Sequence, residues 1–498
     1  MNQNILKNIP SVNELLESPE ISRLTDVYPR QFVVDTIRGV LDEIRQSLRS
    51  KDFSLNPPVN KGRCEKDAVF HGRNSEEIKE SPELENIDVS PHRLCQLIQY
   101  TLDQKCAGIE YAINTTGIIL HTGLGRAPIT EDAARRIQEI LKGFCTLEIE
   151  KGTGRRGVRY HGVERLICMI TGAESALVVN NNAAAVLLTL DTLAQGREAV
   201  ISRSQLVEIG GSFRMPDVMA KSGSILVEVG TTNKTYVHDY KNAITERTSL
   251  ILKVHQSNFK IVGFTESVEL KDLVSLGQEH NIPVAYDLGS GALIDLQKYG
   301  LPHEPTVQEA IKAGVDVVTF SADKLLGGPQ GGIIAGKKKW VDLLKKNPLT
   351  RALRVGKLTI AGLEATLKLY LEEDIATKKV PVLSMMLTPV EIVEERCKRF
   401  IDAIRSKAEN YFEISLFDGV SEMGGGSLPG EGIPTKIVSL RSEKISAGAL
   451  AARLRMHNPP VFARIEQDSV LLDMRTVYDA EVDIIVQALE KIVQGYKK

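Results

Sequence analysis

Short β-rich runs alternate with amphipathic helical stretches between residues 108 and about 370, and this alternation restricts the fold more than any other feature. It is typical of a mainly parallel sheet covered by helices on both faces, because parallel strands need long crossover connections. The predicted strands include Ser175–Val179, Glu198–Ile201, Ser224–Val229 and Ser249–Val254. We therefore expect an α/β domain over residues 108–370.

Two charged residues follow predicted strands of this domain. Lys324 comes after the apolar run 315–320 and is followed by glycines up to Gly332, while Asp287 ends the run 282–287. Alone, either residue is more often a surface lysine or a helix-capping aspartate. Together, in this order, they match what pyridoxal phosphate requires. A lysine amine holds the aldehyde as a Schiff base, and a buried carboxylate keeps the pyridine nitrogen protonated so that the ring acts as an electron sink.

A third feature would complete such a site. The strand 175–179 runs into the stretch 180–186, where the chain turns from strand to helix and includes Asn182 and Ala183. A run of asparagines is often only a turn. Because a helix N-terminus offers free backbone N–H groups and a positive dipole end, its place after a strand of this sheet favours a cradle for the cofactor phosphate.

The composition narrows the class of protein. The chain has 498 residues, enough for two or three domains, and a formal net charge of −2 that gives no global signal for nucleic acid. It has no apolar run long enough to cross a bilayer, and Met1–Lys7 lacks the basic start of a secretory signal. The six cysteines are dispersed, with no histidine at metal-ligand spacing. We expect a cytoplasmic enzyme without a membrane partner or a metal site.

The remaining segments suggest further domains. Residues 1–50 are predicted to be helical, with the capping-box spacing of Ser11 and Glu14 and a later apolar stripe formed by Val33, Ile37, Val40, Leu41, Ile44 and Leu48. Residues 51–107 combine a polar, acid-rich insertion with a helix, and residues 371–498 predict a small α+β domain that contains a Gly-rich turn at 423–430. By charge alone, the arginines of the helical region are better explained as a solvated surface than as an RNA contact.

Several longer motifs carry a family resemblance. These are Asn114–Arg126, Val207–Arg214, Glu228–Thr235, the Lys324 stretch and Pro460–Glu466. In order along the chain they resemble bacterial selenocysteine synthase, the L-seryl-tRNA(Sec) selenium transferase. The resemblance covers almost the whole chain. It implies the aspartate-aminotransferase-like fold of pyridoxal phosphate enzymes (fold type I), with a helical N-terminal domain and a small α+β C-terminal domain.

The resemblance also implies residue roles. Lys324 would carry the cofactor and move the substrate α-proton, and Asp287 would pair with the pyridine nitrogen. The implied cofactor contacts are Lys324, Asp287, Asn258, Asn182, Ala183, Gln205 and Ser321. Asn258 would contact the phenolic oxygen, and Gln205 would lie over the ring face. The selenium donor, selenophosphate, would be bound by Arg126, Arg351 and Arg354. Because Arg351 and Arg354 lie three apart, one helical turn could direct both at one anion.

The implied reaction converts seryl-tRNA(Sec) to selenocysteinyl-tRNA(Sec), by β-elimination through an aminoacrylyl-tRNA intermediate that accepts selenium from selenophosphate. In the family, the N-terminal domain, residues 1–50 here, holds the tRNA, and the enzyme is a homo-oligomeric decamer described as a pentamer of dimers. We carry both properties over as expectations.

Two other functions are also to be weighed against the sequence. A pyridoxal phosphate lyase acting on a free amino or sugar acid would share Lys324 and Asp287, but it would have no use for the helices of residues 9–50. An RNA-binding protein on a retired enzyme scaffold is disfavoured, because the lysine, the acid and the phosphate turn are all present.

Overall fold

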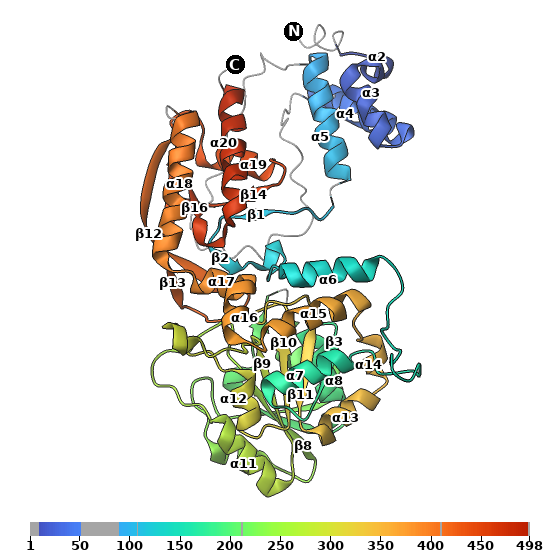
Figure 1. The fold of residues 1–498 in the computed structure, drawn as a ribbon, viewed down its shortest axis with the longest axis vertical. Coiled ribbons are helices and arrows are strands. Elements are labelled where there is room, and N and C mark those ends of the chain that lie inside the picture. Colours follow the sequence, from blue (N-terminus) through green and yellow to red (C-terminus); the bar gives the residue numbers. More distant parts are fainter. Residues whose placement is uncertain (1–8, 51–88, 107, 211–212, 409–410, 497–498) are drawn as a thin grey trace. The chain divides into compact units, whose positions relative to one another are not determined.

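The structure, a computed structural model, describes residues 9–50, 89–106, 108–210, 213–408 and 411–496 (Figure 1). The chain divides into two compact units, Met1–Glu110 and Tyr111–Lys498. The predicted polar insertion at 51–90 lies outside the described residues except for its last two positions. In the part of the chain that the structure describes, no helix is long and apolar enough to cross a membrane.

The first unit is built from helices around one apolar core. They are α2 (Val12–Glu17), α3 (Pro19–Val27), α4 (Arg30–Ser50) and α5 (Pro91–Lys105). Ser11 and Glu14 form the predicted capping box at the start of α2. The predicted stripe of α4 is buried from Val33 to Ile44, and the side chain of its last member, Leu48, lies outside the described part. Leu94, Cys95, Ile98 and Leu102 of α5 join this core, so the unit includes a helix that the sequence placed with the linker.

The second unit contains the predicted α/β sheet. It has seven strands in the order β3-β11-β10-β9-β8-β4-β7. Their bounds are β3 (Ser175–Val179), β4 (Glu198–Ser202), β7 (Ile225–Val229), β8 (Thr248–Val254), β9 (Val284–Gly289), β10 (Val317–Ser321) and β11 (Gly332–Gly336). All neighbours are parallel except β11, which is antiparallel to both β10 and β3. The mainly parallel sheet and its strands agree with the sequence prediction.

Helices bury both faces of this sheet, as expected for a parallel arrangement. One core includes residues of α7 (His161–Thr171), α11 (Leu270–His280), α12 (Val307–Lys312) and α15 (Lys357–Leu369). The other includes residues of α8 (Asn182–Ala194), α9 (Met215–Lys221) and α13 (Lys338–Lys346). The strand ends that carry Lys324 and Asp287 are therefore held between two apolar layers.

A second sheet of five strands lies in the C-terminal part, in the order β15-β16-β13-β12-β2. It is formed by β12 (Glu413–Gly424), β13 (Gly432–Arg441), β15 (Arg464–Glu466), β16 (Ser469–Asp473) and β2 (Ile118–Leu120). α18 (Val390–Ala408), α19 (Ala447–Arg455) and α20 (Val482–Tyr496) contribute to its apolar core. β2 pairs in parallel with β12, so a segment that the sequence assigned to the large domain completes the smaller sheet (Figure 1).

Candidate active site

Lys324 lies in a tight turn after β10 and is buried, with 5% of its surface exposed. The turn is fixed by backbone hydrogen bonds: Gly327 N–H donates to the Lys324 carbonyl at 2.9 Å, and Leu325 N–H donates to the Ser290 carbonyl at 3.1 Å. Gly327 has a φ of +70°, and a Cβ there would collide with Val380, so glycine is required at this point. The chain thus presents one amine in a defined position.

The Lys324 amine is set up for nucleophilic chemistry. Its Nζ makes no hydrogen bond within the described residues. Burial lowers the pKa of Lys324, and the positive charge of Arg126 lowers it further, whereas the charge of Asp287 opposes the shift. A lowered pKa increases the fraction of neutral amine near neutral pH, and only the neutral amine can attack a carbonyl.

Asp287 lies on β9 in register with Thr319 of β10, and it is also 5% exposed. Burial raises the pKa of its carboxyl group, while hydrogen bonds from Asn182 and Thr319 and the charge of Lys324 act in the opposite direction. Asn182 Nδ2 donates to Oδ1 at 2.8 Å and Thr319 Oγ1 donates to the same oxygen at 3.0 Å. Within the described residues no donor reaches Oδ2, so this oxygen is available to a protonated ring nitrogen, as pyridoxal phosphate would offer.

The predicted phosphate turn begins α8. Asn181 caps the helix, and its side chain accepts the N–H of Ala184 at 2.8 Å. The N–H groups of Asn182 and Ala183 precede that bond and have no backbone partner among the described residues, as expected for the first turn of a helix. Gly332 of β11 approaches this turn so closely that a Cβ would collide with the Asn181 backbone. The arrangement suits a phosphate at the helix N-terminus.

Gln205 and Asn258, two further predicted contacts, are bound to neighbouring backbone. Gln205 is buried and its Oε1 accepts the N–H of Val254, at the end of β8, at 2.8 Å. Asn258 Nδ2 donates to the Glu208 carbonyl at 2.7 Å. Ser321, the last residue of β10, is buried and in register with Gly332. Asn258 follows β8 and Ser321 ends β10, the two strands that flank β9 and Asp287, whereas Gln205 follows β4, one strand further along the sheet.

The three predicted anion-binding arginines differ in their surroundings. Arg126 has a φ of +64°, and its guanidinium donates to Asp323 Oδ2 at 2.8 Å, beside Lys324. Arg351 lies in α14 (Leu349–Ala352), and both Arg351 and Arg354 are exposed and without a hydrogen bond or ion pair to the described residues. The expectation that one helical turn carries both is wrong, because the helix ends at Ala352 and Arg354 forms a β-bridge with Val179.

Some neighbours of the candidate site were not singled out from the sequence. Thr319 orients Asp287, and the backbone N–H of His255 donates to the Asp287 carbonyl at 2.8 Å. His255 Nε2 lies 3.4 Å from Oε1 of the buried Glu304. Thr319 could have been identified as the strand residue opposite Asp287, but the pairing of His255 with Glu304 depends on loop packing that has no signal in the sequence.

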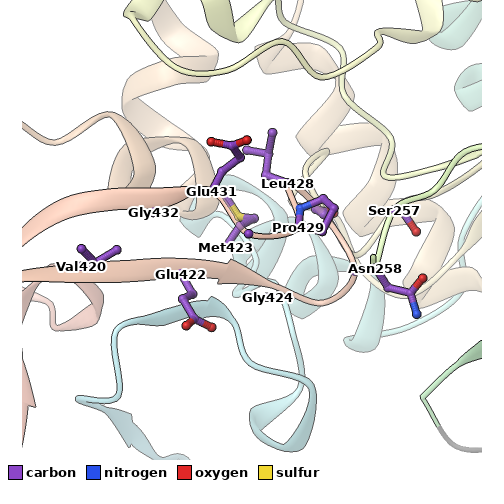
Figure 2. Close-up of a pocket in the computed structure, with 13 residues that line it drawn as sticks. Ser257, Asn258, Val420, Glu422, Met423, Gly424, Leu428, Pro429, Glu431 and Gly432 are labelled. Atoms are coloured by element: carbon purple, nitrogen blue, oxygen red, sulfur yellow. The ribbon is translucent and has the colours of Figure 1, made fainter. Parts of the chain in front are cut away.

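A cavity of about 320 Å³ lies beside Asn258. Figure 2 shows Ser257 and Asn258 at one end of it and residues of the β12–β13 hairpin at the other. The hairpin residues include Glu422 and Met423 of β12 and the glycine-rich turn, defined here as residues 424–430. The cavity is therefore bounded by the loop that follows β8 of the seven-stranded sheet and by the β12–β13 hairpin of the five-stranded sheet.

The chain is similar to known proteins over nearly its full length. A sequence model of the family described as L-seryl-tRNA selenium transferase matches residues 112–478, and one described as selenocysteine synthase N terminal matches residues 6–45. Similar curated proteins are the L-seryl-tRNA(Sec) selenium transferases of Alkaliphilus metalliredigens, 46% identical over 98% of this chain and 99% of the relative, and of Carboxydothermus hydrogenoformans, 45% identical over 99% of both.

Among solved structures, a D-glucosaminate-6-phosphate ammonia-lyase aligns with a TM-score of 0.54 and 19% identity over 80% of this chain and 99% of its own. At this identity the match supports the fold alone. Together with the strand order, it confirms the predicted fold class: the α/β fold of the aspartate-aminotransferase type, with a helical N-terminal part and a small C-terminal part.

Proposed function

This chain belongs to the L-seryl-tRNA(Sec) selenium transferase family, and we propose that it converts seryl-tRNA(Sec) to selenocysteinyl-tRNA(Sec) with pyridoxal phosphate as its cofactor. The positions of Lys324 and Asp287 are the main support for assigning this activity to the candidate site. Both are buried at the ends of adjacent strands, and the charge of each shifts the pKa of the other. Such a pair suits the two ends of one heterocycle.

When bound, pyridoxal phosphate supplies an electron sink that assists loss of the α-proton and departure of the β-hydroxyl group of serine. Lys324 would hold the cofactor aldehyde through its amine. Once displaced by the amino group of serine, the Lys324 amine would move the α-proton. Asp287 would keep a proton on the ring nitrogen through Oδ2, while Asn182 and Thr319 hold its other oxygen.

The other predicted contacts supply binding rather than chemistry. The N–H groups of Asn182 and Ala183 would bind the cofactor phosphate at the start of α8. Gln205 would lie over the ring face, and Asn258 would reach the phenolic oxygen after giving up its present bond to the Glu208 carbonyl. Ser321 would contribute from the end of β10.

Selenophosphate, the proposed selenium donor, is an anion, and guanidinium groups are suited to bind it in a forked geometry. Arg126 is the best placed of the three candidates, since it contacts Asp323 next to Lys324. Arg354 follows Leu353, whose carbonyl accepts the N–H of Asn180 in the predicted phosphate turn. Arg351 and Arg354 are exposed, so their side chains are free to reorient toward a bound anion.

Seryl-tRNA(Sec) is the partner that the family name implies, and we propose that the N-terminal helices hold it. We also propose the homo-oligomeric decamer, a pentamer of dimers, as the working assembly. Because aminoacyl-tRNAs are used by the ribosome, we expect the enzyme to act in the cytoplasm.

The direct test is to supply the purified protein with pyridoxal phosphate, seryl-tRNA(Sec) and selenophosphate, and to measure selenocysteinyl-tRNA. We expect product from the wild-type protein and none from Lys324→Ala. Serine and other free amino or sugar acids serve as competing substrates. Turnover of a free acid, with no product on the tRNA, would overturn the proposal in favour of a lyase.

A further inference from the structure

The glycine-rich turn between β12 and β13 approaches the candidate site from the C-terminal sheet. Its backbone adopts positive φ at Gly424 (+70°), Gly425 (+59°), Gly426 (+68°), Leu428 (+49°) and Gly430 (+72°). So many left-handed residues in one short turn fold the chain tightly, and glycine adopts this conformation with little strain. The turn thus brings backbone, rather than side chains, into the space beside the cavity.

Gly426 of this turn lies close to the Lys324 amine. A Cβ placed on Gly426 would lie 3.6 Å from Lys324 Nζ, 3.5 Å from Asn258 Cβ and 3.6 Å from Ser257 Oγ. These are ordinary van der Waals distances, so an alanine would fit the chain without a collision. It would nevertheless occupy the space next to the amine, where the reacting carbons have to be.

Packing against β2 fixes the position of the turn. Gly424 and Gly425 pack against Ile118 and Leu120 of β2, so closely that a Cβ on either glycine would collide with them. At the other end, Lys260 Nζ lies 2.8 Å from Glu431 Oε1. The turn that carries Gly426 is therefore held mainly by its packing against β2, with the exposed Lys260–Glu431 ion pair at its other end.

Ser427, the next residue, also lines the cavity. It is 3% exposed, and its Oγ has no hydrogen-bond partner within the described residues. A buried hydroxyl without a partner is uncommon, because leaving it unsatisfied costs free energy. An unpaired hydroxyl beside a cavity and next to Gly426 indicates a polar ligand at that point.

We propose that Gly426 and Ser427 form the wall of the active site that selects the seryl group. Gly426 leaves room beside Lys324 Nζ for the α- and β-carbons of serine, and Ser427 Oγ hydrogen-bonds a polar atom of the same group. This inference rests on the proposed function, since it assigns the space to the seryl end of the aminoacyl-tRNA. It makes the turn a specificity element, while the tRNA body binds elsewhere.

The test compares Gly426→Ala with Gly430→Ala. Both place a Cβ in a left-handed position of the same turn, but the carbon added at Gly430 has no atom within 4 Å. Gly430→Ala therefore measures the effect of backbone strain alone. We expect Gly426→Ala to lower kcat/KM for seryl-tRNA(Sec) by about 100-fold, at least ten times the loss in Gly430→Ala. Cofactor content and the gel-shift Kd for the tRNA should match the wild type in both.

Two readouts separate a steric role from a general loss of activity. Addition of seryl-tRNA(Sec) should change the cofactor absorbance of the wild type and of Gly430→Ala, but not of Gly426→Ala. Equal kcat/KM in the two alanine variants would overturn the role of Gly426. A wild-type protein that makes no selenocysteinyl-tRNA would instead contradict the proposed function itself, so the two failures are distinguishable.

Ser427→Ala is an independent test of the proposed wall. It remains decisive if Gly426→Ala does not fold. Because Ser427 Oγ has no hydrogen-bond partner in the described structure, its removal costs the folded chain no internal hydrogen bond. We expect about a fivefold loss in kcat/KM with an unchanged melting temperature and cofactor content. Unchanged kcat/KM in Ser427→Ala would contradict the proposed wall.

Discussion

The two sides of the candidate site differ in what they contribute. The strand ends of the seven-stranded sheet contribute charge and hydrogen bonds: Lys324, Asp287 and the residues that orient Asp287. The glycine-rich turn of the five-stranded sheet contributes space and one unpaired hydroxyl. If both proposals hold, the chemistry and the selection of the substrate reside in different sheets of one unit. Substitutions on the charged side should therefore cost the most activity.

Lys324→Ala should have the largest effect. We expect kcat to fall about ten-thousand-fold, because the substitution would remove both the proposed cofactor attachment and the proposed proton carrier. The measurement is single-turnover formation of selenocysteinyl-tRNA, together with peptide mapping of the cofactor label fixed by borohydride. Lys253→Ala is the matched control, since burial also lowers the pKa of Lys253 and its Nζ donates to the Val268 carbonyl. A label that persists in Lys324→Ala would contradict the assignment.

Asp287→Asn should be the next most severe. The amide oxygen can still accept from Asn182 and Thr319, but its N–H₂ group then faces the ring nitrogen and cannot keep it protonated. We expect kcat to fall about 100- to 1000-fold. The folded chain should lose no stability, because a buried charge has been removed. Activity within tenfold of the wild type, with an unchanged melting temperature, would show that Asp287 does not act on the ring.

Arg126→Ala should change the pH dependence of cofactor capture. Burial lowers the pKa of Lys324, and the charge of Arg126 lowers it further. Capture requires the neutral amine, so its rate rises with pH through this pKa. Removing Arg126 raises the pKa, so the midpoint should move to higher pH and capture at neutral pH should slow. The measurement is the rate of absorbance change when pyridoxal phosphate is added to cofactor-free protein.

The control for that experiment is Arg136→Ala, an exposed arginine paired with Glu139 on the surface. It should leave the midpoint where it is in the wild type. A midpoint that stays in place or moves to lower pH in Arg126→Ala would refute the electrostatic coupling between Arg126 and Lys324.

Thr319→Val tests the support of Asp287 and should have a smaller effect. It removes one of two hydrogen bonds to Oδ1 with little change in shape. We expect about a fivefold loss in kcat. Thr366→Val is a matched control, since Thr366 is buried in α15 and donates to the Gly362 carbonyl away from the site. A similar loss of kcat in both variants would attribute the effect to stability rather than to Asp287.

Lys260→Ala should have the smallest effect. Its ion pair with Glu431 borders the glycine-rich turn, but the Lys260 side chain is 61% exposed, so the pair contributes little free energy. Because β2 also packs against the turn, we expect kcat/KM to fall by no more than about threefold. A loss as large as that of Gly426→Ala would show that the ion pair, rather than the fold, positions the turn.

Local sequence patterns predicted the framework of the molecule well. The strands at 175–179, 198–201, 224–229 and 249–254 have apolar runs that end at turns, and the structure contains all of them. The Ser11–Glu14 capping box also formed as predicted. These features depend on residues close together in the chain, which is why they can be recognised without coordinates.

Features that depend on contacts between distant parts of the chain were harder to predict from the sequence. The polar insertion separates α5 in sequence from the other N-terminal helices, yet α5 packs with them. Likewise β2, near the start of the second unit, pairs with β12 in its C-terminal part. The approach of Gly426 to Lys324 follows from that long-range pairing, and the sequence showed only a glycine-rich turn. The prediction that Arg351 and Arg354 share one helical turn was wrong, because the helix ends at Ala352 and Arg354 forms a β-bridge with the distant Val179.

The most direct test of the central claim is an experimental structure of the protein with pyridoxal phosphate bound. We predict a covalent bond between Lys324 Nζ and the cofactor, a ring nitrogen within hydrogen-bond distance of Asp287 Oδ2, and the phosphate at the N-terminus of α8. A cofactor bound through another lysine, or a ring that does not reach Asp287, would contradict the account.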